Sequence, residues 1–170
     1  MIDKNDLLAW LKVIDKQLKT RIVLIAIGGT AMTLLGLKSS TRDIDFCIEG
    51  KNLKIFKKII RNDKFKVDLF QDGFIFSEQL PNDYIEKSNK IISDLINIDL
   101  RTLSLIDIII TKSARYNERD EEDIATIAKT KKIERKELEK RFKQVKETFA
   151  GNDKDYEYHF NLVLIRHFSE

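Results

Sequence analysis

A pair of glycines and a pair of aspartates are the residues of this sequence best suited to chemistry. Gly28 and Gly29 end an apolar run, and Asp43 and Asp45 follow after a short stretch with helical character. Residues i and i+2 of a strand point to the same face of a sheet, so the two carboxylates are expected side by side. Oxygen ligands of this kind suit Mg²⁺ and the phosphates that it carries. The pattern therefore predicts phosphate chemistry on a nucleotide.

The glycine turn is expected to supply the other half of a phosphate site. Glycine permits positive φ and a close approach of the backbone, and the free N–H groups at the start of the following helix attract anions. Thr30 can add a hydroxyl donor to this turn. Arg42, in the loop before the aspartates, is a candidate phosphate contact, and a solvated loop arginine is the open alternative.

A third carboxylate, Asp68, lies in the alternating sequence of residues 65–70. It is flanked by apolar residues in a predicted strand, and a neighbouring strand would bring it beside the aspartate pair. Three carboxylates so arranged can hold two magnesium ions about 3.5–4 Å apart, which support in-line attack on an α-phosphorus and neutralise the leaving pyrophosphate. A surface charge at the end of a strand is the alternative for Asp68.

The elements that must position these residues follow from hydrophobic periodicity. Strands are predicted over residues 21–27, 43–48 and 65–70, followed by a turn at residues 71–73 and a hairpin of residues 90–92 and 96–100 around Ser93 and Asp94. Helices are predicted over residues 5–19, with Asn5 or Asp6 as the N-cap, and over residues 30–37 and 52–61.

The sequence changes character near residues 101–104, beyond which no strand pattern remains. Ser104 and Asp107 resemble an N-terminal capping pair, and helices are predicted over residues 105–116, 120–130, 134–149 and 155–167. The predicted fold class is α/β (α+β). A small mixed β-sheet core with helices on its faces is expected in residues 1–101, and a C-terminal helical subdomain in residues 102–170.

Composition excludes several classes of protein. The 170 residues are 42% hydrophobic and 35% charged, with a net charge of +3, and no apolar run reaches the roughly 18 residues that span a membrane. The single cysteine, Cys47, excludes an intrachain disulfide, and the absence of a Cys/His cluster argues against structural zinc. A cytoplasmic protein is predicted.

Lys129–Arg141 is rich in Lys and Arg and could line a path for RNA, but the interleaved glutamates favour a solvated helix face.

At the glycines and aspartates the sequence resembles the DNA polymerase β-like nucleotidyltransferase superfamily, whose pattern is a G-[GS] pair, a spacer and then D-h-D, with h apolar. The closer resemblance is to small prokaryotic nucleotidyltransferases of the AbiEii-like and related uncharacterised groups. It rests on Gly28-Gly29-Thr30-Ala31, Thr41-Arg42-Asp43-Ile44-Asp45, Lys112 and Arg119-Asp120-Glu121-Glu122-Asp123, and it spans residues 22 to 127.

The resemblance implies roles for individual residues. Asp43, Asp45 and Asp68 would bind metal, with Asp68 also a candidate general base, and Gly28, Gly29 and Thr30 would hold phosphates. Lys112 would reach the triphosphate, and Asp120 would orient it or contact the acceptor. The structural alternatives are a snorkelling helix lysine and a residue at a helix start.

The implied activity is transfer of a nucleoside monophosphate from an NTP to an acceptor, either an RNA such as tRNA or a protein. A role in a toxin–antitoxin or defence system follows only by analogy. A non-catalytic nucleotide-binding or regulatory module, or an antitoxin-like partner protein, is the alternative on the same fold. The sequence does not predict the base, the acceptor or the oligomeric state.

Overall fold

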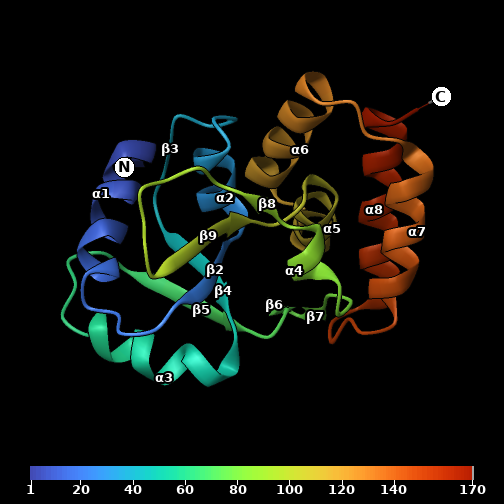
Figure 1. Cartoon of the computed structure of the whole chain (residues 1–170). Helices are drawn as coiled ribbons and strands as arrows, with labels where there is room; N and C mark the ends of the chain where they lie inside the picture. Colours follow the sequence, from blue (N-terminus) through green and yellow to red (C-terminus); the bar gives the residue numbers. More distant parts are fainter. Residues whose placement is uncertain (170) are drawn as a thin grey trace.

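Residues 1–169, which the computed structural model describes, form a mixed α/β fold with helices on the faces of a curled sheet (Figure 1). The strands are β1 (Ile2–Asp3), β2 (Ile22–Ala26), β3 (Ser40–Thr41), β4 (Ile44–Ile48), β5 (Val67–Gln71), β6 (Phe74–Ile75), β7 (Glu78–Gln79), β8 (Asn89–Lys90) and β9 (Ile98–Thr102). The helices are α1 (Lys4–Asp15), α2 (Gly28–Leu34), α3 (Gly50–Ile59), α4 (Tyr84–Lys87), α5 (Leu105–Arg115), α6 (Glu118–Thr130), α7 (Arg135–Lys146) and α8 (Asp153–His167). The predicted fold class is confirmed.

The main sheet has the strand order β7-β6-β5-β4-β2-β9-β8, and β1 pairs with β3 in a separate small sheet. β2 runs antiparallel to β4 and parallel to β9, while β4 and β5 are parallel. A parallel pair needs a crossover connection, and α3 provides it between β4 and β5. Strands β2 and β4 therefore lie at the centre of the sheet.

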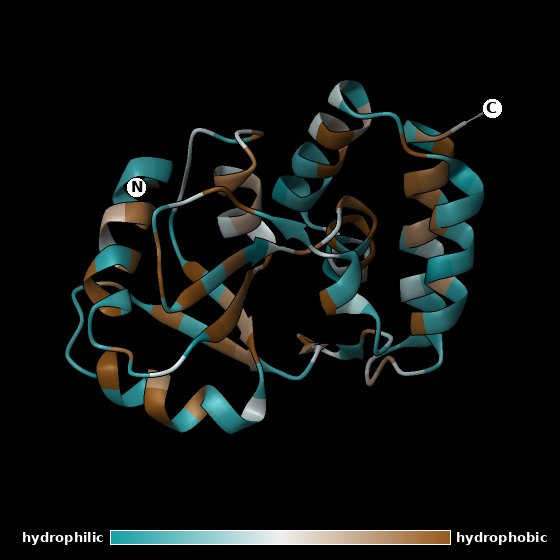
Figure 2. Cartoon of the chain, viewed as in Figure 1, coloured by the Kyte–Doolittle hydropathy of each residue, from teal (hydrophilic) through white to brown (hydrophobic). Residues whose placement is uncertain are grey.

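The two central strands are buried because elements cover both faces of the sheet. Leu24, Ala26, Phe46 and Cys47 are fully buried although successive side chains point to opposite faces, as expected of strands that read as continuous apolar runs. Figure 2 shows the hydrophobic residues gathered on these strands and on the inner faces of the helices. Burial of this layer holds β4 in place, and β4 carries Asp45.

The helices after β9 pack on one another to the side of the sheet (Figure 1). Phe142 of α7 stacks on Phe160 of α8 with ring centroids 4.0 Å apart. Arg141, also on α7 and buried, donates to both carboxylate oxygens of Asp107 on α5, at 2.7 and 2.9 Å, and to Asp83 at 2.7 Å. This ion pair joins α5 and α7 to the loop before α4. The predicted division at residue 101 stays a prediction.

Among residues 1–169, no helix is both long enough and apolar enough to cross a membrane.

Several predicted ends of elements were wrong, and local hydrogen bonds explain the differences. Helix α1 begins after Asp3 rather than after Asn5 or Asp6, because Asp3 and Asp6 form a reciprocal capping box. Ser104 caps α5 as predicted, accepting from the N–H of Asp107 at 3.0 Å. The turn at residues 71–73 is also confirmed, with positive φ at Asp72 and Gly73 between β5 and β6.

The predicted hairpin around Ser93 and Asp94 exists with a much longer loop. Its strands, β8 and β9, pair Lys90 with Arg101, and the loop spans residues 91–97. The carboxylate of Asp15, at the end of α1, accepts the N–H groups of residues 96, 97 and 98 at 2.7–3.0 Å. The N–H groups of residues 96 and 97 are thus engaged by α1 rather than by β8, and β9 pairs with β2 from Ile98 onward.

The buried Arg141–Asp107 pair should be essential to the helical half. Arg141→Leu leaves a buried carboxylate without its partner, which costs about 3–5 kcal/mol. Arg135→Leu on the same helix breaks only the partly exposed pair with Glu139 and should cost less than about 1 kcal/mol. Urea unfolding of both variants tests this, and equal costs would contradict the role given to Arg141.

Candidate active site

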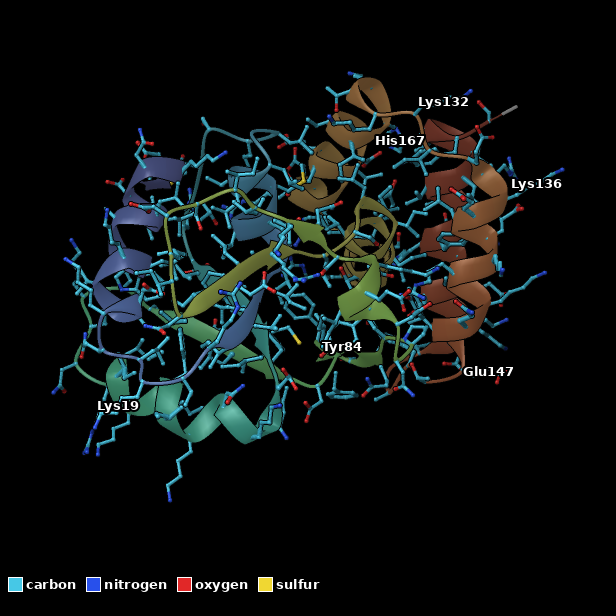
Figure 3. The ribbon with its side chains drawn as sticks, viewed as in Figure 1. Lys19, Tyr84, Lys132, Lys136, Glu147 and His167 are labelled. Carbon is cyan, nitrogen blue, oxygen red and sulfur yellow. The ribbon has the colours of Figure 1, made fainter. Side chains whose placement is uncertain are left out.

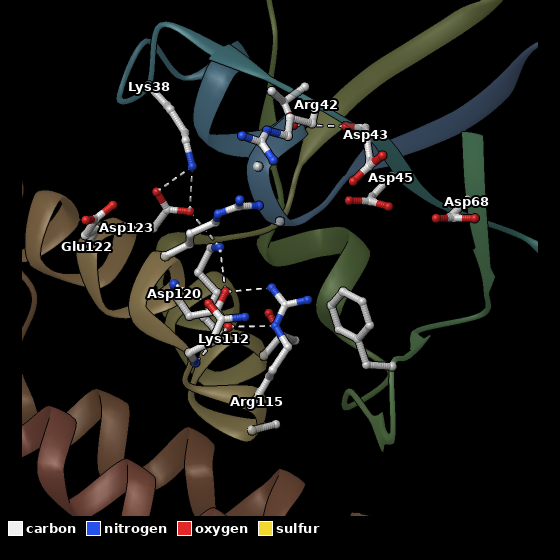
Figure 4. A pocket seen from close by; sticks show the side chains of 18 of the residues that line it. Lys38, Arg42, Asp43, Asp45, Asp68, Lys112, Arg115, Asp120, Glu122 and Asp123 are labelled. Carbon is white, nitrogen blue, oxygen red and sulfur yellow. Dashed lines mark hydrogen bonds and ion pairs between the residues drawn. The ribbon is translucent and has the colours of Figure 1, made fainter. Parts of the chain in front are cut away.

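The structure brings the three predicted carboxylates to one edge of a cleft. Asp45 on β4 is directly opposite Asp68 on β5 in the parallel register, so their side chains share one face of the sheet. Asp43 is exposed and lies just before β4, which begins at Ile44 rather than at Asp43 as predicted. Asp43, Asp45 and Asp68 all line the cleft, whose volume is about 660 Å³ (Figure 4).

The glycine turn packs directly against the aspartate strand. Gly28 has a φ of +54°, a value that favours glycine, and a Cβ there would lie 3.5 Å from Oδ2 of Asp45. A Cβ on Gly29 would lie only 2.8 Å from Oγ1 of Thr41. Among the described residues, the N–H groups of Gly28 and Gly29 make no hydrogen bond. The turn thus presents two free donors in the wall of the cleft beside Asp45.

Thr30 has a different place from the one predicted. Its side chain is buried and lies outside the lining of the cleft. Its hydroxyl donates to the carbonyl of Asp43 at 3.2 Å and accepts the N–H of Asp45 at 3.0 Å. The reason is that Thr30 is the third residue of α2 and lies on the side that faces β4. Thr30 therefore ties the glycine turn to the aspartate strand instead of pointing at a ligand.

The opposite wall of the cleft carries cations from α5 (Figure 4). Lys112 is buried, and its Nζ lies 2.7 Å from Asp123 and 3.3 Å from Asp120 on α6. Arg115, one turn further along α5, donates to both oxygens of Asp120 at 2.7 and 2.8 Å. The predicted lysine is therefore in the cleft, held by two carboxylates.

Asp120 acts as an anchor for these cations in the structure. Burial alone would raise the pKa of Asp120, but hydrogen bonds from Arg115 and the charge of Lys112 outweigh it and hold that pKa below its ordinary value. Asp120 also completes a capping box with Asn117 at the start of α6. Its carboxylate oxygens are engaged by Lys112, Arg115 and the N–H of Asn117.

No role was assigned from the sequence to three residues of this network, namely Arg115, Lys38 and Asp123, although Asp123 ends the motif of residues 119–123. Lys38, in the loop after α2, donates to Asp123 at 3.0 Å and so links the sheet half to α6. A signal was present in the spacing, because Lys112 and Arg115 lie three residues apart on one helix, and Asp120 and Asp123 lie three apart on the next. Residues at i and i+3 share a helix face, so complementary pairs at that spacing predict contact between two helices.

Electrostatic strain is concentrated at Asp45. Burial, together with repulsion from Asp68 and Asp43, raises the pKa of Asp45 to about 6, and the positive charges of Arg115 and Lys112 limit that rise. A cation beside Asp45 would relieve this crowding of negative charge.

Arg42 also lines the cleft. It is exposed and reaches the cleft from the loop before β4 (Figure 4).

The donor set fits a magnesium ion that arrives with its substrate. Among residues 1–169, no three Asp, Glu, His or Cys side chains are gathered closely enough to hold a metal ion by themselves. Mg²⁺ is usually bound by one or two carboxylates together with substrate phosphates and water rather than by a cage of protein ligands. Asp43 and Asp45 meet that requirement when phosphate oxygens complete the shell.

Glu78 is a further carboxyl group of the cleft that the sequence did not single out. It lies on β7 and is fully buried, and both carboxylate oxygens lack a hydrogen-bond partner among the described residues. Burial raises the pKa of Glu78 to about 8. The group is therefore an uncharged acid at neutral pH, in the lining near Phe76 and Phe149.

The comparison with known families settles the general class. A family model described as "Nucleotidyltransferase of unknown function (DUF6036)" matches residues 6–169. The chain belongs to this nucleotidyltransferase family. No curated protein matches the chain. In this family member, the carboxylates, the glycine turn and the cations of α5 surround a single cleft, which is the candidate active site.

Glu78 should make the free energy of unfolding of this nucleotidyltransferase decrease as pH rises. A carboxyl group whose pKa is raised from 4.5 to about 8 on folding takes up a proton on folding between those values. The free energy of unfolding should therefore decrease as pH rises through that window, by at most roughly 1.4 kcal/mol per pH unit. Glu78→Gln removes the titration and should flatten this slope between about pH 6.5 and 8, a range above the pKa of Asp45.

Urea unfolding at several pH values measures the slope. Glu137→Gln, on the exposed face of α7, is the matched control and should keep the slope of the wild type. An unchanged slope in Glu78→Gln would show that Glu78 does not titrate in this window.

Proposed function

We propose that this nucleotidyltransferase is a metal-dependent enzyme that moves a nucleoside monophosphate from an NTP to the hydroxyl group of an RNA, such as a tRNA, or of a protein. One observation carries the proposal. The carboxylates Asp43, Asp45 and Asp68 lie across a single cleft from Lys112 and Arg115, with the free N–H groups of the glycine turn beside them. Its volume of about 660 Å³ is within the usual range for ligand sites, roughly 300–1,000 Å³.

Binding of the triphosphate would use the positive groups of both walls. The N–H groups of Gly28 and Gly29 would donate to phosphate oxygens, and Arg42 would approach from the loop before β4. Arg115 keeps much of its side chain exposed to the cleft while Asp120 holds its guanidinium by two hydrogen bonds. A guanidinium fixed in this way is already oriented for phosphate, which lowers the entropy cost of binding.

Asp43 and Asp45 would hold magnesium with the triphosphate, and Asp68 would complete the set for a second ion. When bound, the metal would neutralise the charge that develops on the leaving pyrophosphate. Repulsion among the three carboxylates supports this assignment, because a cation would remove it.

The proposed reaction balances as a single displacement. The oxygen of the acceptor hydroxyl forms a bond to the α-phosphorus, and the bond from that phosphorus to the oxygen bridging it to the β-phosphorus breaks. Pyrophosphate leaves with that oxygen, and the proton of the hydroxyl passes to Asp68 as general base. Asp68 is partly exposed and is paired with Lys66 only at 3.6 Å, so an acceptor can reach it.

The biological setting is proposed from motif resemblance. The GGTA and TRDID segments resemble those of AbiEii-like nucleotidyltransferases, which supports a role in a toxin–antitoxin or defence system, acting in the cytoplasm. Assignment to that group is part of the proposal. It makes transfer to cellular RNA the first reaction to assay.

Asp45→Asn should separate catalysis from stability. The change removes one proposed metal ligand, and transfer of labelled nucleotide from an NTP to total RNA should fall by roughly 100-fold or more. The free energy of unfolding at pH 7 should rise by about 1–3 kcal/mol, since the ionised carboxylate, with a pKa raised from 3.8 to about 6, destabilises the folded chain. Asp94→Asn, a change in an exposed surface pair with Lys12, is the control and should alter neither.

Label transfer with magnesium and urea unfolding provide the two readouts. Equal transfer by the wild type and Asp45→Asn would overturn the proposed role of the aspartate pair. Tight NTP binding by the wild type with no transfer to any RNA or protein would instead support a non-catalytic nucleotide-binding module.

A further inference from the structure

The segment from α3 to the start of β5 carries a row of positive charges with one acidic residue among them. We call its basic residues the α3 surface: Lys51, Lys54, Lys57, Lys58, Arg61, Lys64 and Lys66. All seven are exposed, and Figure 3 shows nitrogen-tipped side chains extending from α3 into solvent. The only acidic residue between positions 50 and 66 is Asp63, whereas the whole chain has a net charge of only +3. The remainder of the molecule is therefore net acidic.

Most of this charge is uncompensated within the chain. Among residues 1–169, only Lys51 and Lys66 of the α3 surface form ion pairs, with Glu49 at 3.3 Å and Asp68 at 3.6 Å. Asp63 is used elsewhere, because its carboxylate accepts from Nε1 of Trp10 at 2.6 Å. Like charges at i, i+3 and i, i+4 destabilise a helix. Repulsion within the α3 surface is therefore offset only in part by contacts inside the chain.

The other Lys-rich helix, α7, shows the contrast. Arg135 pairs with Glu139, Arg141 with Asp107 and Asp83, and Lys146 with Glu157. Its basic residues alternate with glutamates, as expected of a solvated face. Lys136, Lys140 and Lys143 of α7 also lack an ion pair among the described residues, so the two helices differ in their acidic neighbours: α7 carries Glu137 and Glu139, whereas α3 carries no acidic residue.

The α3 surface leads to the candidate active site. Helix α3 connects the strand that carries Asp45 to the strand that carries Asp68, and it buries Phe56 beneath its exposed face. The last cation of the surface, Lys66, lies 3.6 Å from Asp68. On its far side, β5 pairs with β6 only at Gln71, so the sheet edge beside Asp68 is open. A molecule bound along α3 can therefore reach the proposed general base.

We propose that the α3 surface is the docking surface for the sugar–phosphate backbone of an RNA acceptor, whose ribose hydroxyl then reaches Asp68. The proposal rests on the proposed function, because transfer requires a hydroxyl at that carboxylate. RNA carries on one molecule both a row of phosphates to match the row of lysines and the hydroxyl that attacks. Acidic proteins and anionic membranes supply negative charge without a ribose hydroxyl, and they are alternative outcomes of the test.

The test compares two full-length variants that each lose four positive charges. The α3 variant carries Lys54→Gln, Lys57→Gln, Lys58→Gln and Arg61→Gln, and the control carries Lys132→Gln, Lys136→Gln, Lys140→Gln and Lys143→Gln, all exposed positions. Binding of a fluorescent single-stranded RNA is measured across a salt series. The α3 variant should bind at least about tenfold more weakly at 0.1 M salt, with the slope of log K against log salt reduced by about 3.

The control variant should keep the affinity of the wild type within about twofold. Equal losses in the two variants, or no loss in the α3 variant, would overturn the docking surface. Polyglutamate or anionic vesicles that bind more tightly than RNA and depend on the same four residues would also overturn it.

A separate readout keeps this proposal distinct from the proposed function. Binding of a fluorescent NTP with magnesium should be the same in both variants and the wild type, because no substituted residue lines the cleft. If the wild type binds no NTP, the proposed function fails while the RNA result still decides the docking surface. If NTP binding is intact and RNA binding does not depend on α3, only the docking surface fails.

Discussion

Crowding of negative charge around Asp45 is the constraint to which the rest of the structure responds. The parallel register of β4 and β5 sets Asp45 beside Asp68, and partial burial between the glycine turn and the helices raises the pKa of Asp45 to about 6. The free energy that this arrangement costs is limited by Lys112 and Arg115, which face the carboxylates from α5. Those cations are fixed in turn by Asp120 and Asp123 on α6. The helical half is thus part of the electrostatics of the site.

Three features that line the cleft or lead to it lower the stability of the folded chain. Glu78 is buried without a partner, Asp45 is crowded, and the cations of α3 repel one another. Local arrangements that oppose folding are expected where a protein binds or reacts. All three border the cleft or lead to it, whereas the buried pair of Arg141 and Asp107 lies in the helical half, outside the lining of the cleft.

The parts of the site that the sequence predicts are those governed by local periodicity. The alternation of β4 and β5 predicts that Asp45 and Asp68 share a sheet face, and the glycine pair predicts the turn beside them. The direction in which the Thr30 side chain points could not be predicted, because it depends on how α2 packs on β4. The same holds for the long loop between β8 and β9, whose last residues donate hydrogen bonds to the carboxylate of the distant Asp15.

Ion pairing between distant residues is another property that the sequence alone does not predict. In the basic run Lys129–Arg141, the cations Lys132, Arg135 and Arg141 form ion pairs, and three glutamates lie between the basic residues, whereas the α3 surface has a single acidic residue among its cations. Pairing depends on partners far away in the sequence, such as Asp107 for Arg141. The contacts of Lys112 with Asp120 and Asp123 were likewise not predicted, although the matching i, i+3 spacings on α5 and α6 indicate that the two helices touch.

The central claim is that the aspartate pair holds the metal ion of a metal–NTP complex. Calorimetric titration of the wild type and of Asp43→Asn/Asp45→Asn with a non-hydrolysable NTP, with and without Mg²⁺, tests it directly. Magnesium should tighten NTP binding to the wild type by at least about tenfold and should have little effect in the double variant. An equal effect of magnesium on both proteins would contradict it, because the metal would then be held without Asp43 and Asp45.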